Sequence, residues 1–161
     1  MTDRPLVCIF TVVRGEPSRA ELQEMSGCVC FALRRATRAV TQFYDGALKP
    51  HGLRVTQLPI LVAASSRESV PLAALAQELG MDRTTLLRNV RPLVRRRLVS
   101  VAPAPDSRRT EIRATAAGRA LLARVYPEWK GAQARALQSL EGLEWLRGLE
   151  TLSRVARPAA R

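Results

Sequence analysis

The 161-residue sequence has few of the side chains that most enzymes use for proton transfer and metal binding. It contains one histidine and three cysteines, and aromatic residues make up only 4% of the chain. A single imidazole leaves little general acid–base chemistry at neutral pH. The sequence also has no nucleophile elbow, no phosphate-binding loop and no carboxylates clustered beside a base. We therefore expect no catalytic residue, no cofactor and no enzymatic activity.

The cysteine content and the length of the apolar runs exclude further classes of protein. An odd number of cysteines argues against a disulfide framework and favours a reducing, cytoplasmic environment. Cys28 and Cys30 lie two residues apart on an expected helix, about 200° around its axis, so they cannot easily chelate one ion. No further cysteine or histidine pair completes a zinc site, and no stretch approaches the roughly 18–20 apolar residues that span a bilayer. The sequence thus predicts neither a metal site nor a membrane partner.

Positive charge is abundant by contrast. Lysine and arginine together number 26 against 14 acidic residues, which gives a formal net charge of +12, and Lys49 and Lys130 are the only lysines. Apolar residues make up 47% of the chain, with Ala and Leu dominant, so one modest helical domain can form a core. The charge suits a polyanion bound with strong salt dependence. Charge alone is equally compatible with a non-specific architectural DNA-binding protein.

A helix-turn-helix pattern occupies residues 70–96. Pro71 is expected in the first turn of one helix, which Gly80 ends in a left-handed conformation. Asp82 is expected to cap a second helix, whose apolar residues share one inward face. Outward side chains near a helix N-terminus can read the major groove. The residues predicted to bind DNA from this helix are Arg83, Thr84, Thr85, Arg88 and Arg91. For the arginines at 95–97, a solvated helix end and a DNA contact both stay open.

A β-hairpin is expected directly after the second helix, as the wing of a winged helix-turn-helix. Two short strands, over 98–102 and 110–113, flank a turn that carries Arg108 and Arg109 beside Asp106. An arginine at the tip of a wing can enter the minor groove, where the negative potential attracts a cation. A carboxylate is repelled by phosphate, so we expect Asp106 to orient these arginines rather than to contact DNA.

Long amphipathic helices flank this region. A helix over 28–49 carries apolar residues spaced alternately by four and three, a seam suited to packing on another helix. Thr115 is expected to cap a helix that reaches about Leu140, and a last helix follows Gly142. Surplus apolar faces at both ends imply a two-fold homodimer on a palindromic site. The expected regions are a winged helix-turn-helix over 55–114, dimerisation helices over 25–54 and 115–161, and an N-terminal extension over 1–24.

Three segments together resemble the MarR family of winged-helix transcription factors: L-A-Q-E-L-G-M-D-R-T-T-L-L-R-N-V at 75–90, D-S-R-R at 106–109 and A-T-A-A-G at 114–118. The resemblance covers roughly Cys28 to the C-terminus. It implies a mainly α-helical, homodimeric regulator of double-stranded DNA, usually a repressor that a small aromatic molecule or an oxidant releases. The extension before Met25 lies outside the resemblance, so a native start at Met25 and an arm that packs on the partner protomer both stay open.

The run C-F-A-L at 30–33 resembles the organic-hydroperoxide-sensing branch of this family. The resemblance implies that Cys30 is the oxidised residue and that tyrosines of the partner subunit, one of them matching Tyr44, hold its thiolate. Tyr44 lies about 21 Å further along the same helix, so the two could meet only across a dimer. Val55 stands where the second tyrosine belongs, and Arg34 could partly replace it by stabilising the thiolate. The alternative is that Cys30 is a small, buried apolar residue.

Overall fold

The computed structural model describes residues 16–104, 109–139 and 144–155. In chain order its elements are α1 (Arg19–Ser26), α2 (Val29–Leu48), η1 (Lys49–His51), α3 (Leu58–Ser66), β1 (Val70–Pro71), α4 (Leu72–Glu78), α5 (Arg83–Arg95), β2 (Val99–Pro103), β3 (Thr110–Ala114), α6 (Ala116–Ser139) and α7 (Glu144–Val155). The chain divides into two compact units, residues 1–38 and residues 39–161, with the boundary inside α2.

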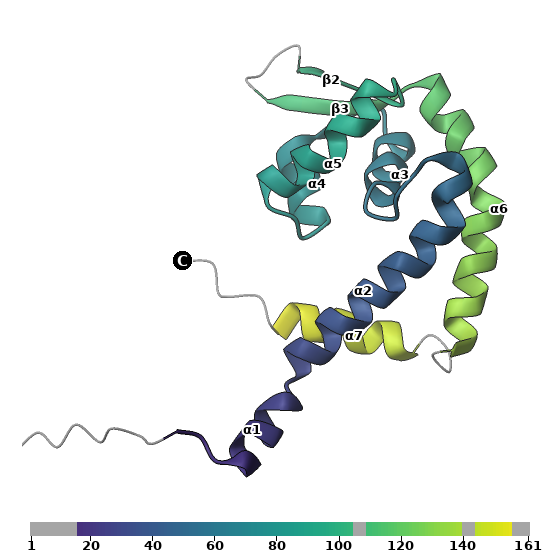
Figure 1. The fold of residues 1–161 in the computed structure, drawn as a ribbon. Helices are drawn as coiled ribbons and strands as arrows, with labels where there is room; N and C mark the ends of the chain where they lie inside the picture. The colour runs from purple at the N-terminus through teal and green to yellow at the C-terminus, as the bar shows by residue number, and fades with distance from the viewer. Residues whose placement is uncertain (1–15, 105–108, 140–143, 156–161) are drawn as a thin grey trace, which may run out of the picture. The chain divides into compact units, whose positions relative to one another are not determined.

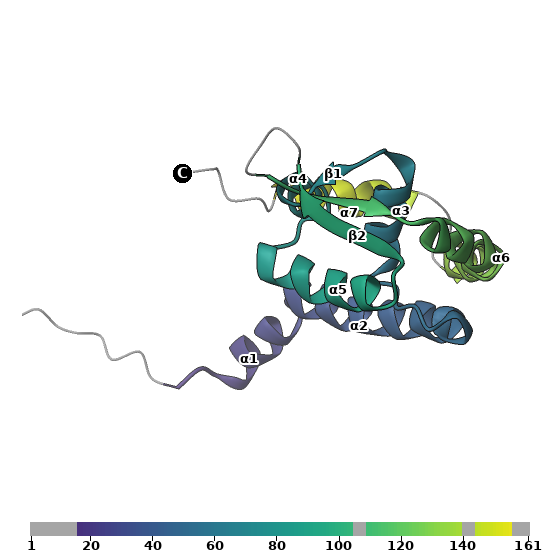
Figure 2. The same cartoon turned by 90° about the horizontal axis from the view of Figure 1, so that it is seen from above.

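The second unit contains a small antiparallel sheet packed against helices (Figures 1 and 2). Its strand order is β1-β3-β2, and β2 pairs with β3 from Val99 opposite Ala114 to Pro103 opposite Thr110. Helices α3, α4, α5 and α6 all contact this sheet. The largest fully buried side chains come from these elements, from the end of α2 and from the connection between α2 and α3: Leu48, Leu53, Ile60, Leu61, Leu75, Leu86, Leu93 and Ile112. The predicted winged helix-turn-helix, mainly helical with a hairpin, is therefore confirmed.

One expectation about Pro71 is wrong. Pro71 does not lie in the first turn of a helix, because Val70 and Pro71 form β1 and pair with Ile112 and Glu111 of β3. The backbone of Pro71 is extended, with φ −60° and ψ 131°, and α4 begins at Leu72. The fixed φ of proline suits either conformation. Pairing prevails here because Val70 is fully buried and directs its side chain into the core.

The turn between α4 and α5 matches the prediction from sequence. Gly80 has a φ of 62°, in the left-handed region. The amide of Met81 donates to the carbonyl of Ala76 at 2.9 Å, which satisfies a carbonyl that the end of α4 would otherwise leave unpaired. This tight turn sets the direction in which α5 leaves α4.

The start of α6 packs closely on the connection between α5 and β2. The hydroxyl of Thr115 donates to the carbonyl of Arg97 at 2.7 Å and accepts the amide of Gly118 at 3.0 Å, so Thr115 caps α6 as predicted. A Cβ added at Gly118 would lie 2.1 Å from the carbonyl oxygen of Leu98. Only glycine fits there without a backbone shift, which explains the glycine in A-T-A-A-G.

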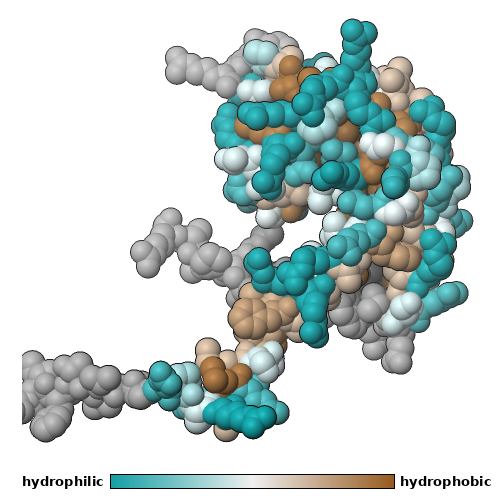
Figure 3. Space-filling model, in the orientation of Figure 1, coloured by the Kyte–Doolittle hydropathy of each residue, from teal (hydrophilic) through white to brown (hydrophobic). Residues whose placement is uncertain are grey.

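The first unit differs from the second in having no buried residue among those described. Its helix α1 begins with a capping box: the hydroxyl of Ser18 accepts the amide of Glu21 at 3.2 Å, and the carboxylate of Glu21 accepts the amide of Ser18 at 2.8 Å. Figure 3 shows hydrophobic residues, in brown, at the surface of α1 and of the first turns of α2. The apolar seam of α2 is exposed in both units, at Val29 in the first and at Val40 and Phe43 in the second.

Candidate nucleic-acid interface

Helix α5 has one buried face and one basic face. Asp82 caps the helix, and its carboxylate accepts the amide of Thr85 at 2.8 Å. Leu86, Val90 and Leu93 are each at most 2% exposed, and they fix the helix against the core. The opposite face and its edges carry the exposed side chains Arg83, Thr84, Arg88, Arg91 and Arg95. The structure thus places four of the five residues predicted for this helix on solvent-exposed surface.

The arginines of α5 are not neutralised by neighbouring carboxylates. Across the described ranges, no ion pair or hydrogen bond involves the side chain of Arg83, Arg88 or Arg91. Each guanidinium therefore keeps its planar fork of donors, which matches a phosphate or the edge of a guanine. Asp82 does not compete for them, because its two oxygens accept the amide and the hydroxyl of Thr85. Both bonds lower the pKa of the Asp82 carboxyl from its usual value, and the bond from the Thr85 hydroxyl has the larger effect.

Thr85 is half-buried, and its hydroxyl donates to Asp82 at 2.7 Å. It can still accept a hydrogen bond, so its contact with DNA stays a prediction. Beside it lies Asn89, a residue that sequence reasoning missed. The Asn89 amide donates to the carbonyl of Thr85 at 2.9 Å and accepts the hydroxyl of Thr56 at 2.9 Å. Asn89 therefore ties α5 to the turn that precedes α3.

The arginines that end α5 have roles within the fold. The guanidinium of Arg96 donates to the carbonyl of His51 at 3.0 Å and to the carbonyl of Gly52. Arg97 has a φ of 57° and takes the left-handed position that usually holds a glycine after a helix. The three arginines at 95–97 therefore differ in role. Arg96 anchors the end of α5 and Arg97 ends the helix, whereas Arg95 is exposed, so a solvated helix end and a DNA contact both stay open for it.

The wing is described up to its tip. Beyond the last β2–β3 pair, the amide of Ala104 donates to the carbonyl of Arg109 at 2.8 Å, and the side chain of Arg109 is exposed. Arg108 and Asp106 lie outside the described residues. Their roles at the tip stay predictions, and so does the DNA contact of Arg109.

His51 connects elements that are far apart in the sequence. Its Nε2 lies 3.5 Å from a carboxylate oxygen of Glu128 on α6. That nitrogen is buried and has no hydrogen-bond partner in the part of the chain that the structure describes. Because the His51 carbonyl also accepts from Arg96, the connection between α2 and α3 contacts both α6 and α5.

The two residues of the hypothesised redox pair have different surroundings. Cys30 is exposed with a free thiol in the single chain, so the fold of one protomer does not bury it. Tyr44 is buried, and its hydroxyl donates to Gln133 of the same chain at 2.6 Å. Burial raises the pKa of Tyr44, so this hydroxyl stays protonated at neutral pH. Val55 contributes its backbone amide to Asp45, at 2.7 Å. A role of Tyr44 towards a partner's thiol stays a prediction.

The described residues contain no group of three or more histidine, cysteine, aspartate or glutamate side chains that could hold a metal ion. Their helices include none with the length and apolar character needed to cross a membrane.

Comparison with known proteins gives matches among solved structures. The M. tuberculosis transcriptional regulator MosR in complex with DNA is 38% identical, over 80% of this chain and 96% of that one, with a TM-score of 0.74. A MarR-family transcriptional regulator from Rhodococcus sp. RHA1 is 26% identical, over 88% and 100% of the two chains, with a TM-score of 0.67. CouR from Rhodococcus jostii RHA1, bound to p-coumaroyl-CoA, is 28% identical over 85% and 97%, with a TM-score of 0.68. No protein-family model and no curated protein matches the chain.

Proposed function

The chain belongs to the MarR family of winged-helix transcriptional regulators, and we propose that it is a homodimeric repressor of a palindromic DNA operator. The observation that carries this proposal is the outward face of α5, where Arg88 and Arg91 are exposed and unpaired among the described residues. The buried face behind them holds the helix that carries both side chains against the core. A similar protein solved in complex with DNA supports the same partner for this chain.

In the proposed complex α5 enters the major groove and the wing reaches the adjacent minor groove. Arg88 and Arg91 bond a guanine edge or a phosphate, since either accepts a planar pair of donors. Arg83, Thr84 and Thr85 contact the groove near the start of the helix. At the wing, Asp106 orients the side chains of Arg108 and Arg109, which add affinity with little base preference.

The proposed homodimer places two such helices on one operator. The exposed apolar residues of the α2 seam, Val29, Val40 and Phe43, support a helical partner, because a water-facing row of this kind is typical of an interface. Two-fold symmetry then matches a palindrome whose half-sites are one DNA turn apart.

Replacing Arg88 tests the DNA-binding proposal. Arg88→Ala should cost about 1–3 kcal/mol on the operator and relax base preference, because a bidentate base contact is lost. Fluorescence anisotropy would compare a duplex from the region upstream of the protein's own gene with a random duplex. Arg124→Ala is the matched control, since Arg124 is an exposed arginine on α6. Equal losses for both variants on both duplexes would instead indicate a non-specific architectural protein.

We further propose that a small molecule releases the repressor from DNA. CouR, solved with p-coumaroyl-CoA, is 28% identical to this chain, which supports a small organic effector. Purified protein bound to its operator would be titrated with p-coumaroyl-CoA and with aromatic acids of similar size. Release by one of them at low concentration is expected, and operator binding that is insensitive to all of them would count against this class of effector.

The second candidate signal is oxidation at Cys30. The exposed, free thiol supports it, because a sensor thiolate must be accessible to peroxide. The thiolate attacks the O–O bond, which gives a sulfenic acid and releases an alcohol, and a small cytosolic thiol then forms a mixed disulfide and releases water. Organic hydroperoxide should release operator from the wild type but not from Cys30→Ser, with Cys28→Ser as the control. Equal release from all three proteins would exclude Cys30 as the trigger.

A further inference from the structure

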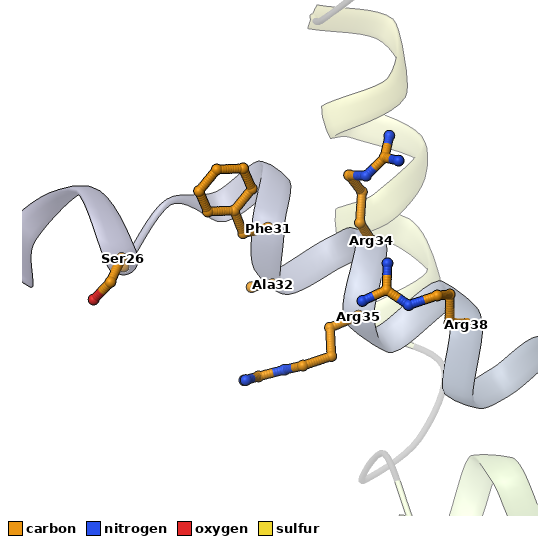
Figure 4. A pocket seen from close by; sticks show the side chains of 7 residues that line it. Ser26, Phe31, Ala32, Arg34, Arg35 and Arg38 are labelled. Atoms are coloured by element: carbon orange, nitrogen blue, oxygen red, sulfur yellow. The ribbon is translucent and has the colours of Figure 1, made fainter.

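The arginines of α2 and of α5 differ in what holds their side chains. At the start of α2 a hollow of about 390 Å³ is lined by Phe31, Arg34, Arg35 and Arg38, among others. Figure 4 shows Arg34 and Arg38 on one side of the helix and Arg35 on another, and none of the three forms an ion pair or a hydrogen bond with a described residue. Arg96 at the end of α5 is different, because its guanidinium donates to two backbone carbonyls. An arginine bonded in this way positions a part of the fold.

The two acceptors of Arg96 lie in the connection between α2 and α3, 45 and 44 residues earlier in the chain. The guanidinium donates to the carbonyl of His51 at 3.0 Å and to the carbonyl of Gly52. A Cβ built on Gly52 would lie 3.5 Å from a terminal nitrogen of Arg96, so the guanidinium packs directly on this glycine. The planar fork of an arginine suits two neighbouring carbonyls, which the compact ammonium of a lysine does not match.

The connection is itself fixed on the end of α2. The amide of Val55 donates to the carboxylate of Asp45 on α2 at 2.7 Å. The amide of Leu53 donates to the carbonyl of Leu48 at 3.4 Å, and both leucine side chains are at most 2% exposed. Because the connection is held at several points, the carbonyls that accept from α5 keep a fixed position relative to α2.

A second contact joins the same connection to the middle of α5. The hydroxyl of Thr56 donates to the side chain of Asn89 at 2.9 Å. Asn89 and Arg96 are about two helical turns apart, roughly 10 Å along the axis. Pro92 lies between them and removes one backbone hydrogen bond of the helix, so a contact on each side of it is needed to hold α5 as one unit. One contact alone acts as a pivot, whereas two contacts at this separation fix the direction of the helix axis.

Apolar packing constrains this direction only weakly. Leu86, Val90 and Leu93 hold α5 on the core, but the burial of apolar surface is not directional, whereas a hydrogen bond weakens steeply as it becomes misaligned. A tilt of about 10° around one pivot moves a helix end that is about 10 Å away by roughly 2 Å. Recognition requires side chains held to within about 0.5 Å. Contacts that prevent such a tilt therefore decide where the guanidinium groups of α5 meet DNA.

We propose that Arg96 is a positioning residue that transfers the direction of α2 to the DNA-reading helix. Together with Thr56 and Asn89, it sets the distance and the angle between the two α5 helices of the homodimer. These in turn set the spacing of half-sites that the protein accepts. The inference rests on the homodimer and the palindrome under Proposed function, since spacing has a meaning only for two linked reading helices.

Operators with altered spacing test this role. Fluorescence anisotropy would compare the palindromic duplex from the region upstream of the protein's own gene with a version that has one extra base pair at its centre. The added pair moves the half-sites apart by about 3.4 Å and turns one relative to the other by about 35°. The wild type should therefore bind the longer duplex about tenfold more weakly. For Arg96→Ala this spacing penalty should fall to about threefold or less, because α5 can tilt towards the displaced half-site.

Three further variants separate positioning from charge. Arg96→Lys keeps the charge but not the planar fork, so its spacing penalty should fall as in Arg96→Ala. Thr56→Ala breaks the second contact without changing α5, and its penalty should fall by about twofold. Arg95→Ala is the matched control, since Arg95 forms no ion pair or hydrogen bond with a described residue. Its penalty should equal that of the wild type, whatever the effect on affinity.

The penalty is a ratio for one protein on two duplexes, so a purely structural role of Arg96 would lower both affinities alike and leave the ratio unchanged. An unchanged ratio in Arg96→Ala and Arg96→Lys, with the wild type still sensitive to spacing, overturns the positioning role and leaves the proposed function intact. An equal fall in Arg95→Ala also overturns it, because loss of charge would then explain the effect. If circular dichroism shows that Arg96→Ala does not fold, Arg96→Lys and Thr56→Ala decide. A wild type that binds both spacings equally overturns this role together with the palindromic homodimer.

Discussion

Helix α5 and the first turns of α2 both present arginines on one face, but only α5 is supported from behind. Leu86, Val90 and Leu93 hold α5 against the core, whereas no described residue before Ala39 is buried. Reading base edges requires side chains placed to within a fraction of an ångström, which only a rigid element provides. Basic charge in the sequence is therefore a weak indicator of a DNA contact, and the packing behind that charge is a stronger one.

The support of α5 comes from segments that are distant in the sequence. Thr56 holds Asn89 in the middle of the helix, and the carbonyls of His51 and Gly52 hold Arg96 at its end. The first unit has no equivalent contacts among its described residues. Changes in the support of α5 should therefore alter the stability of the whole protein, while equivalent changes in α1 should not.

The largest effect is expected from Gly118→Ala, which disturbs the connection after α5. The added Cβ would lie 2.1 Å from the Leu98 carbonyl oxygen and 3.1 Å from a methyl group of Leu61. We expect the free energy of unfolding to fall by about 3 kcal/mol, because backbone must move. Urea denaturation measures this free energy of unfolding. The control Gly46→Ala, with no heavy atom within 4 Å of the added Cβ, should gain up to about 1 kcal/mol. Equal stability of both variants would contradict the close packing of α6.

Local signals were sufficient to predict most of α5 from the sequence. The Asp82 cap, the left-handed Gly80 and the apolar spacing along the helix each depend on residues close together in the chain. The cap of α6 at Thr115 was predictable for the same reason. Elements of this kind can be derived without knowledge of the tertiary structure.

Contacts between distant segments were not predictable. Thr56 and Asn89 are 33 residues apart, and His51 and Arg96 are 45 apart, so no periodicity relates them. The two residues of β1 are too few for an alternating pattern, and only their pairing with β3 defines them as a strand.

The next largest effect is expected from removing the N-terminal cap of α5, compared with removing that of α1. Asp82→Ala should lower Tm at neutral pH, because it removes the cap of a helix that belongs to the core. Ser18→Ala removes the equivalent cap of α1 and should leave Tm unchanged, with only a small loss of helical circular dichroism. A similar fall in Tm for both variants would mean that α1 is as firmly supported as α5.

The cap at Asp82 also predicts a pH dependence. Hydrogen bonds from the Thr85 hydroxyl and amide lower the pKa of Asp82 from its ordinary value of 3.8. The folded state therefore favours the charged carboxylate, and its stabilising effect is complete above the ordinary pKa and is lost as the pH falls through the lower folded pKa. The difference in Tm between wild type and Asp82→Ala should accordingly shrink below about pH 3.8. Asp82→Asn, which keeps a capping oxygen, should lie near the wild type at neutral pH.

The smallest effect is expected from Arg97→Gly, at the residue that ends α5. Arg97 has a φ of 57°, where an L-residue other than glycine is strained by roughly 1–2 kcal/mol. Glycine removes that strain but loses more conformational entropy on folding, so the net gain in stability should be below about 1 kcal/mol. Arg95→Gly is the matched control, because Arg95 is an exposed arginine inside the helix, where glycine should cost about 1 kcal/mol. Both variants lose one positive charge, so their difference in urea midpoint reports the backbone conformation alone. The two midpoints should move in opposite directions, and a shift of both to lower urea would show that residue 97 does not hold the left-handed conformation that separates the supported helix from the wing.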